Sequence, residues 1–552
     1  MHAASPDRIA GAEMSAVPSR ARSKATGSGR VARGGMLARL PRLGERAETV
    51  VVLAALLGIA GAARWPNLWL IPTFTDETIE VKLAYDIARG QVAPLTNVDP
   101  YIGALWNWVL AISFRTFGLS PWLPRFLAFL GGIATVGAAW WLGREIGGRA
   151  GGRVAGVVAA LFMAGCSTHV LVNSHVAWSH STTPLWTTLG FGCLLRALRG
   201  EGRWLMGAGF FLGLAVQTHI TAVLLLPGAA LTLLLQRPGL LRTRWVVFGA
   251  LAFAVAISNL LVYNALTGGG TLTGGQAVLA DYTGQDDGGV DSGSYFENLS
   301  RLTLATSWVL SGAIEKRRFV GETLAQPLLV GYLGLAIGSV LWAARRGRWL
   351  PLLVSLPYLL ALPLLQGKYE PILNGRYVMP ILPLVFASTG LVVADSVGAL
   401  RARWPGRAAL LGGLVLGLTA LVALYPLAPL AVYQRSARTN HAILAAHEAV
   451  LAGREADEVV LVDYGLDGVF FMAAGSAFKA TELLLGGSNV PYTVIDARQA
   501  SVEDALSGHE SRLLVLNTEK VRTLSRNFAL TALMGGERDG PGFGVFRLTA
   551  RP

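Results

Sequence analysis

The sequence contains few charged residues for its length. Charged side chains make up 15% of the 552 residues, hydrophobic residues make up 53%, and the mean hydropathy is +0.48. A soluble domain of this size would need far more charge to cover its surface. Acidic residues are scarcer than basic ones, and the formal net charge is +13. Because the Arg residues cluster in short loops between apolar runs, their pattern indicates membrane topology and argues against nucleic-acid binding.

Cysteine is almost absent as well. Cys166 and Cys193 are the two cysteines of the sequence, and both lie in apolar stretches. Their placement excludes a metal-ligand spacing and makes a disulfide framework improbable. Residues 1–46 have little apolar content and are rich in Arg, Gly, Ser and Ala, which predicts a disordered basic tail on the cytoplasmic side. No clear small-residue cleavage site follows, so we expect an uncleaved first helix.

Apolar runs recur along most of the chain. Since a bilayer crossing takes about 20 apolar residues, we predict a polytopic α-helical membrane protein with about eleven spans, near 48–66, 122–142, 152–172, 182–198, 204–217, 221–235, 245–264, 324–343, 349–365, 377–396 and 408–431. The connecting loops then alternate between Arg-rich loops and loops that carry Asp, Glu, His and Asn. The positive-inside rule predicts that the Arg-rich side and the N-terminus are cytoplasmic, in the cytoplasmic (inner) membrane.

Residues 101–117 are apolar enough to be a span, but counting them would place every later Arg cluster outside. This stretch is short, rich in Trp and Tyr, and contains Asn107 and Arg115. We therefore predict a helix in the outer interface. Two outer loops are long, at about 67–121 and 265–323. The second begins with a Gly/Asp-rich tract, which we interpret as a mobile lid over an outer site.

The composition changes at the end of the predicted transmembrane domain, 47–434. In residues 435–552, the runs VVLVDY, YTVID, RLLVLN and GVFRL predict strands, and the stretches 436–452, 468–485 and 518–535 predict helices. This alternation predicts a small soluble α/β domain with a mainly parallel sheet. An odd number of spans places that domain outside the cytoplasm.

The first candidate site residues are Asp76 and Glu77, which follow the first span by about ten residues. Acids are also favourable in the first turn of a helix, so these two residues are equally explained as a helix start at Thr75 or Asp76. A carboxylate held at the lipid–water boundary has a raised proton affinity, which suits a general base.

Histidines and cations gather at the same predicted depth. His175 and His180 lie around the outer end of the third span with His169 and Asn173, and His219 lies at the next outer turn. Each alone is explained as a structural residue, but polar groups at membrane depth are costly and usually serve a path or a site. Metal binding through His175 and His180 is possible, but the spacing of these two residues matches no known metal-ligand motif.

A third group, QGKYEPILNGRYVMPILPLV, contributes Lys368, Arg376 and Tyr377. Arg376 alone is explained as an interfacial anchor and Tyr377 as an ordinary belt aromatic. Outward-facing Arg is scarce in this chain, however, and Lys and Arg together form a charge-assisted phosphate site. Carboxylate, imidazoles and cations on one side of a membrane predict a lipid-linked phosphate ester as the substrate.

In its motifs and their order, the chain resembles the GT-C superfamily of polyprenyl-phosphate-sugar-dependent glycosyltransferases. It is most similar to the branch with the protein O-mannosyltransferases and the aminoarabinose transferases. The resemblance covers about 48–430 and rests on FTDE (74–77), the following helix ending in ARG (88–90), YIGALWNWVLAISFRTFG, PRFLAFLGG, REIGGRAGGRVAG and NGRYVMPILPLV.

This resemblance implies a GT-C-like fold and a mechanism. Asp76 would be the catalytic base, and the acceptor hydroxyl would attack the anomeric carbon with inversion. Arg376 and Tyr377 would contact the carrier phosphate, while Glu77, His175, His180, His219 and Lys368 would line the substrate site. The chain departs from the family where His180 stands at the place of an Asp and His219 at that of a Lys. Since His does not bind a hard divalent cation as a carboxylate does, metal dependence is in doubt and no cofactor is certain.

The predicted function is therefore transfer of a sugar from a polyprenyl-phosphate carrier to a lipid, glycan or protein acceptor. Two alternatives stay open. The first is a transporter or flippase of a lipid-linked substrate, although the sequence shows no internal repeat of the kind that such folds usually contain. The second is a non-catalytic scaffold whose soluble C-terminal domain binds a partner.

Overall fold

The computed structural model describes residues 44–68, 75–120, 122–275, 294–312, 322–365, 374–436, 441–463, 490–495, 513–517, 529–535 and 543–549. Helices form at all eleven positions where the sequence predicts spans. They are α1 (Glu45–Arg64), α4 (Leu123–Gly165) at two positions, α6 (Thr183–Leu198), α7 (Trp204–Thr218), α8 (Leu226–Gln236), α9 (Arg244–Ala256) with α10 (Ser258–Thr267), α13 (Glu322–Arg345), α14 (Leu350–Leu365), α15 (Leu382–Arg403) and α16 (Ala408–Leu424).

Shorter elements connect these helices. They are α2 (Thr75–Ala88), α3 (Leu105–Phe117), α5 (Ser167–Ser174), η2 (Ser179–Thr182), η3 (Ile220–Leu225), η4 (Pro238–Arg242), α12 (Tyr295–Ser311), η5 (Asn374–Tyr377), η6 (Pro405–Arg407), α17 (Leu427–Ser436) and α18 (His441–Gly453). Most of the Gly/Asp-rich tract predicted as a lid lies outside the described residues, which include residues 268–275 of it, and so does most of the predicted basic tail.

The chain is a multi-pass membrane protein. By length and composition, five of the described helices can cross a membrane, and α9 with α10, bent by 67°, gives a sixth candidate. One of the five is α4, whose 43 residues are broken at Gly148, where φ is 66°. Since one crossing takes about 20 residues, α4 is long enough to cross twice. Three further apolar helices are shorter, so the total of about eleven crossings stays a prediction.

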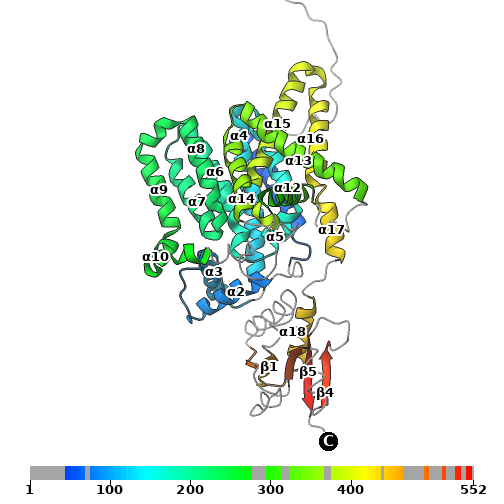
Figure 1. The fold of residues 1–552 in the computed structure, drawn as a ribbon. Helices are drawn as coiled ribbons and strands as arrows, with labels where there is room; N and C mark the ends of the chain where they lie inside the picture. The colour runs from blue at the N-terminus through cyan, green and yellow to red at the C-terminus, as the bar shows by residue number, and fades with distance from the viewer. Residues whose placement is uncertain are drawn as a thin grey trace, which may run out of the picture. The chain divides into compact units, whose positions relative to one another are not determined.

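The core of the helical region is built around α4 and α15, which lie side by side (Figure 1). Small residues bring the two helices together, because a Cβ atom at Gly390 would collide with the carbonyl oxygen of Ala155. Leu142, Val158 and Leu384 fill the space around this contact and are fully buried or nearly so. The backbones of α4 and α15 therefore approach closely in the core of the helical region.

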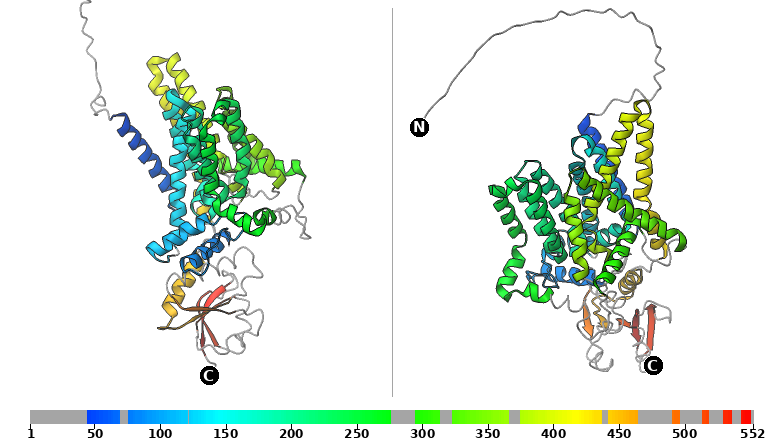
Figure 2. Two further views of the ribbon diagram at one scale, coloured as in Figure 1. Left: turned by 90° about the vertical axis from the view of Figure 1, so that its left-hand side faces the viewer. Right: turned by 45° about the horizontal axis from the view of Figure 1, so that its top comes forward.

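The helices α2 and α3 lie at one end of the bundle, opposite the turns between α8 and α9 and between α15 and α16 (Figures 1 and 2). We call the end with α2 and α3 the site end and the opposite end, with its Arg-rich turns, the basic end. The predicted interfacial helix is α3. It buries Trp106, Leu110 and Phe114, and it exposes Ile112 and Phe117. An exposed apolar face on a short helix suits the membrane interface.

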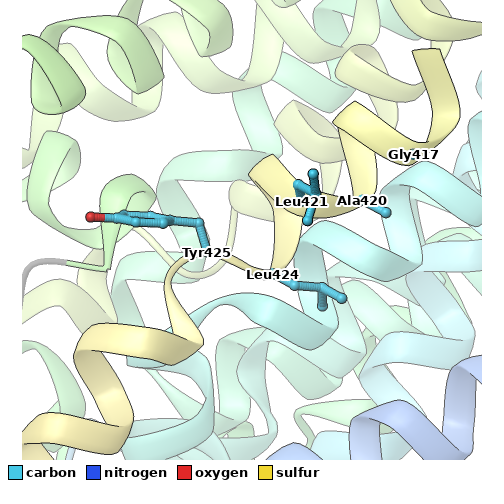
Figure 3. A pocket seen from close by; sticks show the side chains of 5 residues that line it. All are labelled: Gly417, Ala420, Leu421, Leu424 and Tyr425. Atoms are coloured by element: carbon cyan, nitrogen blue, oxygen red, sulfur yellow. The ribbon is translucent and has the colours of Figure 1, made fainter. Parts of the chain in front are cut away.

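One apolar hollow of about 390 Å³ lies against α16 (Figure 3). It is lined by Gly417, Ala420, Leu421, Leu424 and Tyr425. Leu421 is largely exposed, which is expected of a helix face that meets lipid chains. The lining offers no charged group, so this hollow is separate in character from the polar residues predicted as the site.

The described C-terminal residues form a five-stranded sheet in the order β2-β1-β3-β5-β4. Its strands are β1 (Val460–Asp463), β2 (Tyr492–Ile495), β3 (Leu513–Asn517), β4 (Ala529–Met534) and β5 (Phe543–Thr549), and four of them were predicted. Two predictions were wrong. Part of the predicted helix 518–535 is β4, and the sheet is mixed because β3–β5 and β4–β5 pair antiparallel. The predicted helix at 468–485 lies outside the described residues.

Candidate functional site

The acidic helix α2 is fixed by its buried carboxylates. Glu77 accepts two hydrogen bonds from Arg125, at 2.7 Å to Oε1 and 2.5 Å to Oε2, and a third from the backbone N–H of Ala177. One turn later, Glu80 accepts from the backbone N–H and the hydroxyl of Ser179. Together, Glu77 and Glu80 with Arg125, Ala177 and Ser179 form what we call the α2 anchor.

The α2 anchor determines what Glu77 can do. Glu77 and Arg125 are each only 6% exposed, and a two-point pair of this kind is among the stronger charge-assisted contacts. Both carboxylate oxygens of Glu77 are engaged within the protein, although Glu77 was predicted to contact substrate. Asp76 precedes it in the first turn of α2, at a helix start as the sequence indicates. The structure does not describe the side chain of Asp76, so the role of Asp76 as a general base stays a prediction.

The α2 anchor is expected to contribute to the stability of the folded chain. In a Glu77→Gln variant, Arg125 would keep a buried positive charge without its carboxylate, which costs about 3–5 kcal/mol when one partner of a buried pair is removed. We expect a clearly lower thermal unfolding temperature for the full chain in detergent. Asp86→Asn on the same helix is the matched control, since its pair with Lys82 is partly exposed and spans one helical turn. Equal melting of Glu77→Gln and wild type would contradict a stabilising anchor.

His175 belongs to a second buried network, centred on Arg64 at the end of α1. The ring nitrogen Nε2 of His175 donates to the backbone carbonyl oxygen of Arg64 at 2.6 Å. The Arg64 guanidinium, which is fully buried, donates to the carbonyls of Met163 and Ala164 at the end of α4 and to the hydroxyl of Ser174. His175, predicted as substrate-binding, is therefore engaged where α1, α4 and α5 meet, and this network is well suited to hold α5 in place.

Four predicted residues come together in one buried cluster. The rings of His180 and His219 lie 3.8 Å apart between centroids, and Tyr377 lies 6.1 Å from His180 and 5.6 Å from His219. The Arg376 guanidinium lies 4.6 Å from the Trp178 ring centroid and 5.0 Å from that of Tyr377, and it donates to the Tyr377 hydroxyl. We call Trp178, His180, His219, Arg376 and Tyr377 the cation–imidazole cluster.

Both imidazoles in this cluster are neutral. Burial and the neighbouring Arg376 lower the pKa of His219 to about 3, and burial with His219 and Arg376 lowers the pKa of His180 well below its ordinary value. The Nδ1 atom of His219 accepts from the backbone N–H of Thr221 at 3.2 Å and lies 2.7 Å from the Thr221 hydroxyl. Since Nδ1 is an acceptor, Nε2 carries the proton of the neutral His219 and is a donor.

His180 is the least satisfied residue of the cluster. It is only 3% exposed, and neither of its ring nitrogens has a hydrogen-bond partner among the residues that the structure describes. Leaving a buried polar atom unpaired costs about 1–3 kcal/mol, so such atoms are usually retained for a reason. One ring nitrogen donates and the other accepts. The imidazole can therefore take one hydrogen bond from a bound hydroxyl and give another.

Comparisons with known proteins bear on the fold of the chain. Residues 103–263 match the family model described as dolichyl-phosphate-mannose-protein mannosyltransferase. The crystal structure of ArnT from Cupriavidus metallidurans in the apo state is 14% identical, with a TM-score of 0.55 over 92% of this chain and 99% of that one. The same protein bound to undecaprenyl phosphate is 13% identical, with a TM-score of 0.52 over 92% and 100%. No curated protein matches the sequence. The chain has the fold of the GT-C glycosyltransferases.

The family match covers a shorter part of the chain than the fold similarity does. The matched residues run from α3 into α10 and include Arg125, His175, His180 and His219. The fold similarity extends over 92% of the chain. Lys368 lies outside the described residues, and its predicted contact with substrate stays a prediction.

The described residues of the candidate site do not fit a hard divalent cation. Among them, no group of three His, Cys, Asp or Glu side chains is placed to hold a metal ion. The nearest candidates, His180 and His219, offer two nitrogen donors beside the positive charge of Arg376, whereas Mg²⁺ and Ca²⁺ prefer several oxygen ligands. The cluster is better suited to an anion.

Sequence reasoning missed four residues that shape the site. Trp178, Arg125, Glu80 and Arg64 are all buried and engaged, and the patterns did not single them out. A signal existed for Glu80, which lies one helical turn after Asp76, and for Arg125, which lies within PRFLAFLGG. Arg125 lies 48 residues from its partner Glu77, and Glu80 lies 99 residues from its partner Ser179. Contacts between residues so far apart in the chain cannot be inferred from their spacing.

Proposed function

We propose that this protein is a membrane glycosyltransferase. It moves a sugar from a polyprenyl-phosphate carrier to a lipid, glycan or protein acceptor at the outer face of the cytoplasmic membrane. The observation that carries the proposal is the cation–imidazole cluster, in which a buried guanidinium adjoins two neutral imidazoles, and His180 has no hydrogen-bond partner for its ring nitrogens among the described residues. The GT-C fold, and the undecaprenyl phosphate bound by ArnT from Cupriavidus metallidurans, support it.

The cluster accounts for how the carrier phosphate is held. The Arg376 guanidinium lies near the Trp178 and Tyr377 rings, and its positive charge would bind the phosphate oxygens of the carrier. The Nε2–H group of His219 adds a neutral donor. In a site that excludes water, such fixed donors stabilise the charge that develops on a departing phosphate. The carrier's prenyl chain would stay among the membrane helices.

The reaction is a single displacement with inversion. The acceptor oxygen forms a bond to the anomeric carbon, and the bond from that carbon to the phosphate oxygen breaks with its electron pair going to the phosphate. Asp76 takes the proton of the acceptor hydroxyl as general base. The α2 anchor joins the helix that carries Asp76 to the segment that carries Trp178 and His180, so base and phosphate site keep a fixed relation.

Purified full-length protein in proteoliposomes tests the proposal. It is mixed with radiolabelled polyprenyl-phosphate mannose, arabinose, aminoarabinose or glucose and a membrane extract as acceptor pool. We expect label to move from one donor to an acceptor, which would also identify the sugar. Movement of labelled lipid between leaflets without any acceptor, and no transfer from any of the four donors, would replace this proposal with a transporter.

A further inference from the structure

The basic end contains a cation that the proposed reaction does not use. Arg348 lies in the turn between α13 and α14, and its Nη2 atom is 3.2 Å from where a Cβ atom on Gly148 would be. Gly148 is the residue at which α4 breaks. The guanidinium of Arg348 is thus packed against the broken helix and is only partly exposed.

The acids around Arg348 are already engaged by other cations. Glu145 pairs with Arg199 at 2.5 Å and with Arg196 at 3.3 Å, and Asp395 pairs with Arg346 at 3.0 Å. The side chain of Arg348 forms no ion pair or hydrogen bond with the residues that the structure describes. Burial and the neighbouring Arg199 and Arg346 lower its pKa.

The surroundings of Arg348 also indicate a lipid environment. Trp349 follows it directly and is 45% exposed, and Trp342 at the end of α13 is 39% exposed. Exposed Trp side chains at the ends of apolar helices mark the depth of the lipid headgroups. A half-buried guanidinium at that depth, with further cations beside it, suits a phosphate group that arrives on a lipid.

We propose that Arg348, supported by Arg199 and Arg346 beside the α4 break, binds the phosphate of an anionic phospholipid in the leaflet at the basic end. The site is distinct from the cation–imidazole cluster at the site end and does not depend on the sugar-transfer reaction. The bound headgroup supplies a negative charge that no described residue provides to Arg348 in an ion pair, and so links the turns after α6 and α13 to the middle of α4.

Native mass spectrometry of the full chain, titrated with dioleoylphosphatidylglycerol, tests this site. We expect the wild type to bind at least one phosphatidylglycerol that Arg348→Gln binds about fivefold more weakly, the effect of one Arg near an anionic surface. Arg348→Lys should retain most of the affinity. Arg203→Gln is the matched control, because Arg203 lies at the same end with a 71% exposed side chain. Equal losses in Arg348→Gln and Arg203→Gln would show diffuse attraction and overturn the proposal.

A measurement on the wild type alone covers the case in which Arg348→Gln does not fold. Phosphatidylglycerol should raise the thermal unfolding temperature more than phosphatidylcholine does, and inorganic phosphate at the same concentration should not replace that effect. Equal protection by inorganic phosphate would show that the site takes a free anion and would overturn the lipid assignment. Equal effects of the two lipids would overturn the anion site itself.

Discussion

Asp76→Asn is expected to lower the rate of sugar transfer by about 10²- to 10⁴-fold, the contribution of a positioned general base. The amide is nearly isosteric with the carboxylate but does not accept a proton from the acceptor hydroxyl. Because the α2 anchor uses Glu77 and Glu80, the helix should dock normally in this variant. Initial rates with the radiolabelled donor identified for the wild type give the measurement.

Asp86→Asn is the control for this substitution. It removes a carboxylate from the same helix, where Asp86 pairs with Lys82 near the far end, and we expect a rate close to wild type. Unaltered thermal unfolding of Asp76→Asn would separate lost chemistry from lost folding. A transfer rate in Asp76→Asn equal to that of Asp86→Asn would remove Asp76 from the mechanism, and the base would have to be sought elsewhere.

Arg376→Gln should show the second large effect. Removing a preorganised donor to a developing charge typically costs about 10²- to 10³-fold in kcat. We expect kcat to fall by more than KM rises, because the phosphate carries more charge once the sugar bond breaks. Arg376→Lys should recover only part of the loss, since an ammonium does not form the planar fork of a guanidinium and interacts less well with the nearby Trp178 and Tyr377 rings.

The control for Arg376 is Arg301→Gln on α12. Arg301 is a partly exposed cation paired with Glu297 one turn away, and its loss should leave kcat unchanged. Donor titrations on all four proteins separate kcat from KM. If Arg376→Gln kept the wild-type kcat and changed KM alone, Arg376 would bind the donor without stabilising its departure. If neither constant changed, the phosphate site would lie elsewhere.

The helical region was the most predictable part of this chain. Each apolar run gave a helix, because hydrogen bonds within one segment satisfy its backbone in lipid without help from distant residues. The ambiguous run at 101–117 became the short helix α3, as its Asn, Arg and aromatic content indicated. The sheet was harder to predict. The run ALTALM at 529–534 reads as a helix by pattern, but it pairs with β5, and such pairing depends on partners outside the local sequence.

The positions of the candidate site residues were also predictable only in part. His180, His219, Arg376 and Tyr377 were predicted to lie together because they share a depth and a side of the membrane, and in the structure they form one cluster. Glu77 and His175 share that depth, but they contact Arg125 and the Arg64 carbonyl instead. Membrane depth can be inferred from a single sequence, whereas position around the bundle depends on how distant helices pack.

The α2 anchor has a consequence for biosynthesis. Arg125 is made 48 residues after Glu77, and Ala177 is made 100 residues after it. At bacterial translation rates of about 5–20 residues per second, the last of these partners follows roughly 5 to 20 s later. Glu77 can pair with Arg125 before that time, but the contacts of Glu77 with Ala177 and of Glu80 with Ser179 cannot yet form. The α2 anchor is therefore complete only after the segment that follows α5 has been made, so a ribosome that stalls before that point leaves α2 without part of its anchor.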